Sequence, residues 1–375
     1  MSMTASTTAL KTKRRAQTQL GVAWEQFRKN RLAVIGGVCI VLLYLMAIFA
    51  PFIAPDGLSS YSTTDITRYR KPTPIHWWNA PTGAFAPYVD QFGQKLNMTT
   101  FQQDFLPTGV KCPLRLFVRG DSYKILGIPG DVHLFGTGRA DCKVFLWGAE
   151  GLGRDLFTRI MYASQISLTI GVVSVLISTL IGLSMGSLAA YFGGWVDNLT
   201  NRAIEVISAI PSLFLIFLIR AVFPPGSNPI VSLFVILGVL AFISWGGLAR
   251  VVRSQLLSVR EQDYVTAANS MGASQGRIMF RHMLPSMTSY VIVTLSLAIP
   301  GTILLESGLS FIGIGVTEPY ASWGTLLNQT QEGGFSSITD RPWMLIPGFF
   351  IVFTVMCYQL LGDGLRDAFD PRKRQ

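Results

Sequence analysis

Uninterrupted apolar stretches constrain this chain more than any other feature. Leu32 to Ala54 contains no charged residue, and about 20 apolar residues are enough for a helix to cross the roughly 30 Å hydrocarbon core of a bilayer. Charged residues make up only 14% of the sequence, whereas soluble domains average about 25%, and the mean hydropathy is +0.41. These values exclude an ordinary soluble domain and a disordered chain, and they predict an integral membrane protein.

Six segments qualify as membrane spans. Besides 32–54, four stretches without charge lie at about 166–191, 230–249, 286–305 and 343–361. A sixth, 204–223, is apolar apart from Glu205 and Arg220, whose long side chains can reach the membrane interfaces. Because lipid cannot satisfy backbone hydrogen bonds, each span is expected to be an α-helix, so the expected fold class is an all-α polytopic membrane protein.

The distribution of basic residues predicts the orientation. Six spans place both termini on one side of the membrane. Lys and Arg number seven in residues 1–31, five in 250–285 and four in 362–375, whereas the segment 317–342 contains only Arg341. Since Lys and Arg of short loops accumulate on the cytoplasmic side, we expect the two termini and the 250–285 loop to be cytoplasmic. The net charge of +10 is then a consequence of topology, and no nucleic-acid partner is expected.

The long connection 55–159 is expected to form an extracytoplasmic insertion domain. Its Pro, Gly and aromatic residues and the alternating run Leu114–Arg119 predict short strands and turns. Cys112 and Cys142 fall in this segment. Because external compartments are usually oxidising, we expect a Cys112–Cys142 disulfide; the alternative is that both thiols are reduced and buried.

The loop 250–285 is the most informative stretch for function. Ser258 and Glu261 have capping-box spacing for a helix start, and Gly272 suits a left-handed position at a helix end. The loop is therefore expected to contain two short helices joined at Gly272, with Pro285 in the first turn of the next span.

Small and charged residues are combined in the first of these helices. Ala267 and Ala268 provide a small surface, and the residues around it are Asp263, Tyr264, Arg277 and Arg281. Small side chains let a partner's walls approach the backbone while the charges fix the register, as in helix-in-groove docking. The alternative is a solvated amphipathic linker.

Several motifs together resemble one family. Ala267-Ala268, Gly272 and Leu284-Pro285 resemble the EAA motif of permease subunits in binding-protein-dependent ABC importers. Further segments resemble the C-type permease of the dipeptide and oligopeptide branch: 153–159, 191–197, 263–265, 271–274, 280–285, 309–313, 362–367 and 370–372. Thr266 departs from the pattern, since many members of the family carry a glutamate at that position.

The resemblance implies a type I ABC importer permease fold in the plasma or inner membrane. It implies a subunit that forms the pore with a homologous second permease, receives substrate from an extracytoplasmic binding protein and is driven by two cytoplasmic ATPases. ATP and Mg would be held by those ATPases, with no cofactor and no enzymatic activity in this chain, which has no phosphate-loop motif. The residues expected to dock the ATPase are Asp263, Tyr264, Thr266, Ala267, Ala268, Gly272, Arg277, Arg281, Leu284 and Pro285.

Two charged residues within or near spans are candidates for the pore. Glu306 could meet a peptide amino terminus at the outer mouth, or it could hydrogen-bond locally to Ser307 or the Gly308 backbone. Arg220 could attract a peptide carboxylate, or it could extend to the interface.

Other functions stay open at this point. The cargo could be di- or oligopeptides, or nickel or another small solute, because relatives of this branch carry such solutes. A self-contained secondary transporter would be expected to carry buried coupling carboxylates, and only Glu306 comes close. An intramembrane protease needs a nucleophile and a base within reach of each other, but none of the three histidines lies in a predicted span.

Overall fold

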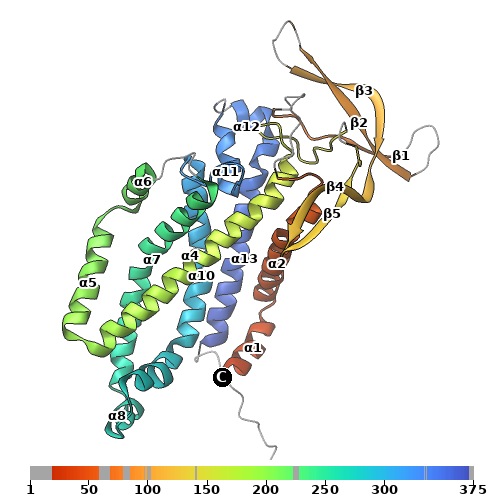
Figure 1. Cartoon of the computed structure of the whole chain (residues 1–375). Coiled ribbons are helices and arrows are strands. Elements are labelled where there is room, and N and C mark those ends of the chain that lie inside the picture. The colour runs from red at the N-terminus through yellow and green to blue at the C-terminus, as the bar shows by residue number, and fades with distance from the viewer. Residues whose placement is uncertain are drawn as a thin grey trace, which may run out of the picture.

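The computed structural model of the chain describes residues 19–58, 68–78, 85–96, 98, 103–139, 142–222, 228–332, 334 and 336–370. It is an elongated helical bundle with β-strands at one end (Figure 1). Its long helices are α2 (Arg31–Ile48), α4 (Leu156–Phe192), α7 (Pro229–Arg260), α10 (Thr288–Phe311) and α13 (Ile346–Phe369). The shorter helices are α1 (Gln19–Lys29), α3 (Ala50–Ile53), α5 (Gly194–Ala209), α6 (Ser212–Val222), α8 (Asp263–Ser270), α9 (Gln275–Arg277), α11 (Trp323–Asn328) and α12 (Ser336–Asp340).

Among the described residues, five helical segments are long and apolar enough to cross a membrane, and a bent pair gives a sixth if it is counted as one span. Helices α4 and α7 pack closely because glycines line their crossing. A Cβ atom on Gly186 would lie 2.5 Å from the Ala249 carbonyl oxygen, and one on Gly182 would lie 2.8 Å from that of Trp245. Small residues of this kind let membrane helices approach closely.

The third predicted span, 204–223, is not one continuous helix. Helices α5 and α6 are bent by 83° relative to each other, and the break lies at Ile210 and Pro211. Proline lacks an amide hydrogen and clashes with the preceding turn, and it forces the residue before it out of the helical region; Ile210 accordingly has φ −89° and ψ 120°. Since α4 ends and α7 begins at opposite ends of the bundle, the bent pair carries the chain across (Figure 1).

Several helices extend beyond the predicted spans. Helix α4 begins at Leu156, inside the predicted 55–159 insertion, and α13 continues through much of the predicted 362–375 tail to Phe369. Helix α7 continues to Arg260, so the expected capping box is wrong: Ser258 lies within α7 and Glu261 is its C-terminal cap. The extension is held by packing, because Leu256 is buried among residues of the following loop. In the N-terminal region, the predicted 32–54 span divides into α2 and the one-turn helix α3.

The two ends of the bundle differ. Helix α1, helix α8 and the C-terminal end of α13 lie at one end, and the strands lie at the other with α11 and α12 (Figure 1). This arrangement places the predicted cytoplasmic segments together and away from the predicted insertion domain.

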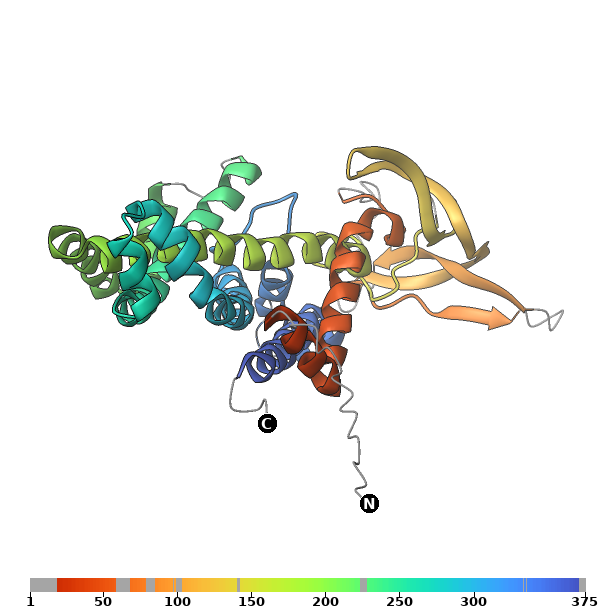
Figure 2. The same cartoon turned by 90° about the horizontal axis from the view of Figure 1, so that it is seen from below.

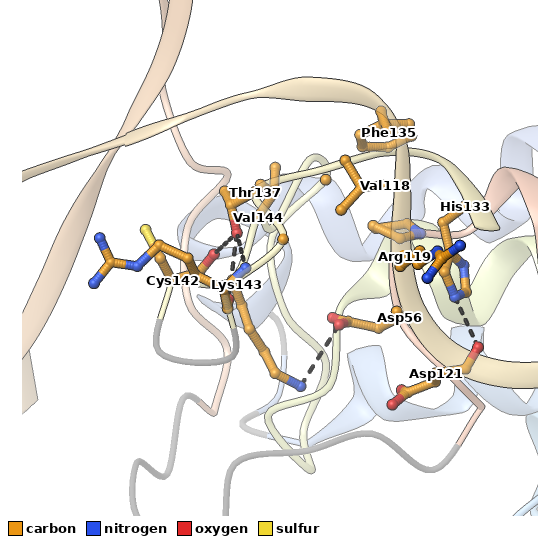
Figure 3. Close-up of a pocket in the computed structure, with 15 residues that line it drawn as sticks. Asp56, Val118, Arg119, Asp121, His133, Phe135, Thr137, Cys142, Lys143 and Val144 are labelled. Carbon is orange, nitrogen blue, oxygen red and sulfur yellow. Dashed lines mark hydrogen bonds and ion pairs between the residues drawn. The ribbon is translucent and has the colours of Figure 1, made fainter. Parts of the chain in front are cut away.

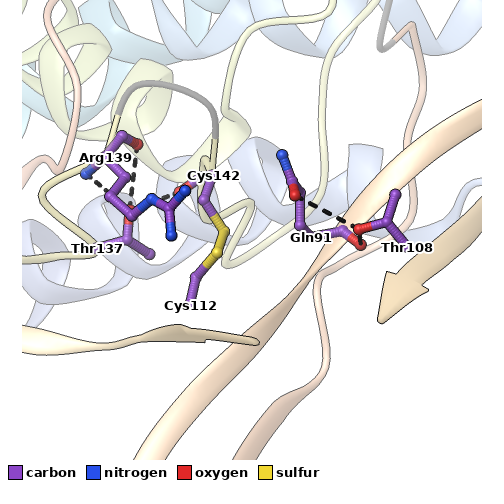
Figure 4. The surroundings of a disulfide bond; sticks show 6 residues. All are labelled: Gln91, Thr108, Cys112, Thr137, Arg139 and Cys142. Atoms are coloured by element: carbon purple, nitrogen blue, oxygen red, sulfur yellow. Dashed lines mark hydrogen bonds between the residues drawn. A yellow bond between two sulfur atoms is a disulfide. The ribbon is translucent and has the colours of Figure 1, made fainter. Parts of the chain in front are cut away.

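The strands form two small antiparallel sheets. Strands β1 (Ile75–Trp78), β2 (Phe85–Leu96) and β3 (Gln103–Pro113) form one, and β4 (Arg115–Ile125) and β5 (Ile128–Gly136) form a hairpin. Apart from β1, these strands are longer than the short strands expected. A disulfide joins Cys112 to Cys142, and both residues are buried (Figure 4). It ties the end of β3 to the segment that leads into α4.

Candidate functional site

The segment from Glu261 to Met287, called the elbow here, connects α7 to α10 at the end of the bundle away from the strands. Helix α8 is held there by its inner face, where Val265 and Ala268 are buried. They belong to an apolar cluster that also contains Val252, Leu256, Ile278, Met283 and Met287. This cluster joins the ends of the two long helices to the elbow, so that α8 and the helix ends form one packed unit.

The outer face of the elbow is exposed. Asp263, Thr266 and Ala267 point away from the cluster, as does Tyr264. The sequence suggested that the two alanines form one shared surface, and the structure shows that they do not. Ala267 lies on the outer face, whereas Ala268 is only 3% exposed and belongs to the inner one.

Two large apolar side chains extend this outer face, and sequence reasoning missed both. Met271 is 81% exposed, and Phe280 is also largely exposed. The sequence offered no clear signal for them, because the same loop contains other apolar residues, such as Ile278 and Met283, that are buried. Exposed apolar side chains beside charged ones are typical of a surface that a partner covers.

Gly272 ends α8 in the left-handed conformation that the sequence predicts. Its φ is +76°, its amide donates to the Asn269 carbonyl oxygen at 2.9 Å, and the Ala273 amide donates to that of Ala268 at 3.1 Å. This is the hydrogen-bond pattern of a Schellman motif. A Cβ atom at Gly272 would meet nothing within 4 Å, so the requirement for glycine comes from the backbone alone.

The rest of the elbow returns the chain to the bundle through α9, a π-helical turn (Ile278–Met283) and a 3-10 turn (Leu284–Met287). Arg277 and Arg281 are exposed on this stretch, and Leu284 is partly buried. Pro285 lies in the first turn of the 3-10 segment that leads into α10, as expected.

A cavity of about 360 Å³ opens between α4, α7 and α10. No residue on its wall is charged, and the hydroxyl-bearing residues there are Ser178, Thr179, Ser244, Tyr290, Thr294 and Thr302. Three of these hydroxyls donate to carbonyl oxygens of their own helices: Ser178 to Val175, Ser244 to Leu240 and Thr302 to Ala298. Since their hydrogens are used in this way, these oxygens can offer their lone pairs as acceptors.

Of the two charged pore candidates, Glu306 does not contribute to this wall. Glu306 is fully buried, and its carboxylate accepts hydrogen bonds from the hydroxyls of Ser310 at 2.6 Å and Ser307 at 3.4 Å. Local hydrogen bonding, one of the two alternatives considered for Glu306, is therefore what the structure has, with hydroxyls in place of a backbone group. Arg220 lies in α6, and its side chain is outside the described part of the chain.

An ionic network of two buried arginines, buried Glu150 and half-exposed Glu318 lies at the strand end of the bundle, and sequence reasoning missed it. Arg154 donates to both carboxylate oxygens of Glu318, at 2.7 and 2.8 Å, and it also pairs with Glu150. Arg159 donates to Glu318 at 3.1 and 3.2 Å, and the Gln329 amide donates to Glu150 at 2.7 Å. The network fastens the start of α4 to the connection after α10.

The network also sets the protonation of Glu318. Burial alone would raise its pKa, but hydrogen bonds and charge from Arg154 and Arg159 outweigh burial and hold the pKa of this carboxyl below its usual value. Glu318 is therefore ionised at neutral pH, as the paired arginines require.

These features define a polytopic membrane subunit that has an uncharged cavity among its spans and an exposed elbow at one end. Residues 178–375 match the family model described as binding-protein-dependent transport system inner membrane component. Residues 18–79 match the N-terminal TM domain of oligopeptide transport permease C.

The chain is similar to named permeases over most of its length. It is 32% identical over 351 residues to the oligopeptide transport system permease protein OppC of Bacillus subtilis, covering 93% of this chain and 88% of that protein. It is 31% identical over 355 residues to the dipeptide transport system permease protein DppC of the same organism, covering 94% and 86%. Among solved structures, the MetNI methionine ABC transporter matches with a TM-score of 0.43 and 17% identity, over 56% of this chain and 96% of that one.

The chain belongs to the family of permease subunits of binding-protein-dependent ABC importers. It is thus a multi-pass membrane component of an importer and not itself an enzyme. The resemblance drawn from its motifs is confirmed, and so is the expected fold class.

Proposed function

We propose that this chain forms one half of the passage of a peptide importer and receives the motion of an ATPase through the elbow. The observation that carries the proposal is the division of α8 into two faces. Its inner face is packed onto the end of α7 and onto the π-helical turn that leads to α10, whose Tyr290 and Val291 pack against the same cluster. Its outer face is exposed and presents Tyr264 and Ala267, with Met271 at its C-terminal cap. A partner that grips the outer face would move both long helices, because the cluster couples them.

The remaining subunits follow from the family. A homologous second permease would complete the passage, an extracytoplasmic binding protein would deliver the substrate, and two ATPases would hold ATP and Mg on the elbow side. This chain would need no cofactor of its own. The proposed orientation has the elbow and both termini in the cytoplasm, as the basic residues predict.

Two observations support peptides as the cargo. The relatives matched over most of this chain are named for oligopeptide and dipeptide transport. The cavity wall is uncharged and presents hydroxyl oxygens as acceptors, which suits amide and ammonium N–H donors. A neutral wall would pass peptides of differing side-chain charge, and selection would then fall to the binding protein.

Reconstitution of the complete importer in proteoliposomes tests this function. We expect ATP-dependent uptake of labelled di- or oligopeptides when both permeases, both ATPases and the binding protein are present, and no ATP hydrolysis by this chain alone. Uptake of nickel in place of peptides would move the assignment to another solute. Uptake by this chain alone under an ion gradient would contradict the importer.

A further inference from the structure

The β4–β5 hairpin ends in large apolar residues that point away from the protein. Leu126 is 87% exposed and Ile128 is 71% exposed, both at the turn, whereas the exposed Leu116 and Phe117 lie at the opposite end of the hairpin, where β4 begins. Large apolar side chains exposed together at a turn are typical of a surface that contacts a protein or a membrane.

The conformation of the turn adds an independent observation. Leu126 and Gly127 form a two-residue connection with φ +50° and +88°. Hairpins that face water usually have Asn-Gly or Asp-Gly at such a turn, because a side chain at positive φ is strained. Here a leucine has the strained position and is also the most exposed apolar residue of the hairpin. An apolar side chain at this tip is unfavourable in water, and it becomes favourable if the tip enters an apolar medium.

The hairpin is fixed against the end of the first membrane helix. His133 of β5 contacts the Ala54 carbonyl oxygen at 2.5 Å, Asp121 of β4 accepts from the Gly57 amide at 2.8 Å, and the rings of Phe117 and Phe52 are 6.4 Å apart. Figure 3 shows His133 and Asp121 at a cavity of about 270 Å³, where Lys143 also pairs with Asp56. Figures 1 and 2 both show the hairpin beside the α3 end of α2.

This position makes the hairpin continuous with the membrane-facing surface of α2. Leu45 and Ile48, with Phe49 at the C-terminal cap, are exposed at this end of α2, a helix that is long and apolar enough to cross a membrane. Exposed Lys124 flanks the turn, and its stem can lie along acyl chains while its ammonium group reaches lipid phosphates.

We propose that the β4–β5 hairpin inserts its turn, with Leu126 and Ile128, into the lipid leaflet at this end of the bundle. The occupant of the exposed apolar surface is the acyl-chain region just below the headgroups. The hairpin then anchors the insertion domain at a fixed depth beside α2. This inference does not depend on the cargo or on the docking of an ATPase.

Site-directed fluorescence in the reconstituted full complex tests the insertion. The free cysteines Cys39 and Cys357 are replaced by alanine, and an environment-sensitive label is attached to Leu126→Cys or, separately, to Ile128→Cys. Met98→Cys, an exposed apolar position of the same domain next to β2, is the matched control. An intact Cys112–Cys142 disulfide on non-reducing gels verifies that the domain has folded in each variant.

We expect labels at 126 and 128 to show blue-shifted emission, quenching by phospholipids spin-labelled near the headgroup and loss of quenching by aqueous iodide. The label at 98 should show the opposite behaviour. Quenching of the 126 and 128 labels by iodide to the same extent as the 98 label would overturn the proposal, because the tip would be in water. Protection from both quenchers would also overturn it, because a protein partner would then cover the tip.

Discussion

Adjacent alanines in α8 provide a sharp test of the elbow. Ala267 lies on the outer face and Ala268 is buried in the cluster beneath it, so the same substitution at the two positions perturbs different things. Ala267→Arg places a guanidinium where a docked partner would approach. Ala268→Arg forces the guanidinium into the packed cluster or detaches α8 from it.

The expected magnitudes differ accordingly. At an exposed position away from special features, the change in unfolding free energy is usually within about 0.5 kcal/mol, so Ala267→Arg should leave the isolated subunit as stable as the wild type. A loss of about 1.4 kcal/mol in binding free energy makes the docked contact tenfold weaker. An unpaired guanidinium in an interface costs several kcal/mol, which is more than enough to weaken docking to that extent. Ala268→Arg should lower the free energy of unfolding of the subunit itself by several kcal/mol, because it buries an unpaired guanidinium in the apolar cluster.

The assay compares thermal unfolding of the purified subunit with ATP-driven uptake by the assembled importer. We expect Ala267→Arg to unfold at the wild-type temperature and to lose uptake at least about tenfold, and Ala268→Arg to unfold earlier. Met98→Arg, in the strand domain, serves as a control that should change neither the unfolding temperature nor ATP-driven uptake. Wild-type uptake in Ala267→Arg, or a loss of uptake accompanied by equal destabilisation, would refute the docking role of the outer face.

Three further predictions concern packing and charge. Gly186→Ala should be destabilising by about 1–3 kcal/mol because its methyl group meets the Ala249 carbonyl oxygen, whereas Gly238→Ala, with nothing within 4 Å, should be neutral or stabilising; equal unfolding temperatures would contradict this. Glu150→Gln should lower the free energy of unfolding by about 3–5 kcal/mol, because it leaves the buried Arg154 and Arg159 without their fully buried partner. Denaturant titration measures the loss, and a change below about 1 kcal/mol would argue against the network. Burial raises the pKa of Asp155 from 3.8 to about 7, so its contribution to stability is present below pH 3.8 and is lost as the pH rises towards 7. Asp155→Asn should therefore flatten the dependence of the unfolding free energy on pH over that window, and an unchanged dependence would contradict the shift.

Apolar content alone was enough to predict the long helices. Spans such as α2 and α10 are properties of about 20 consecutive residues, so no knowledge of tertiary contacts was needed. Pro211 within the 204–223 span indicates a kink, but a hydropathy window registers an apolar stretch whatever its bend, so the 83° between α5 and α6 could not be predicted. The helix ends were missed because packing beyond the membrane, as at Leu256, extends α7.

The site could be predicted only in part, for a related reason. The residues of the elbow were predicted, but the opposite orientations of Ala267 and Ala268 depend on the cluster that forms in three dimensions. The ionic network could not be found, since Arg154 and Glu318 are 164 residues apart and neither lies in a regular pattern. Burial of Glu306 likewise depends on the fold, which brings Ser322 against Ser310, the serine whose hydroxyl donates to Glu306. The Cys112–Cys142 pairing was accessible because only two cysteines lie outside the predicted spans.

The central claim is that the outer face of the elbow is gripped by an ATPase subunit. The most direct measurement is photo-crosslinking from a benzophenone amino acid at Tyr264 in the assembled importer in native membranes. The account predicts a crosslinked product containing this chain and an ATPase subunit, with a yield that changes when ATP is bound. Crosslinking only to lipid or water, or labelling of the same position by a reagent confined to the external side, would contradict it.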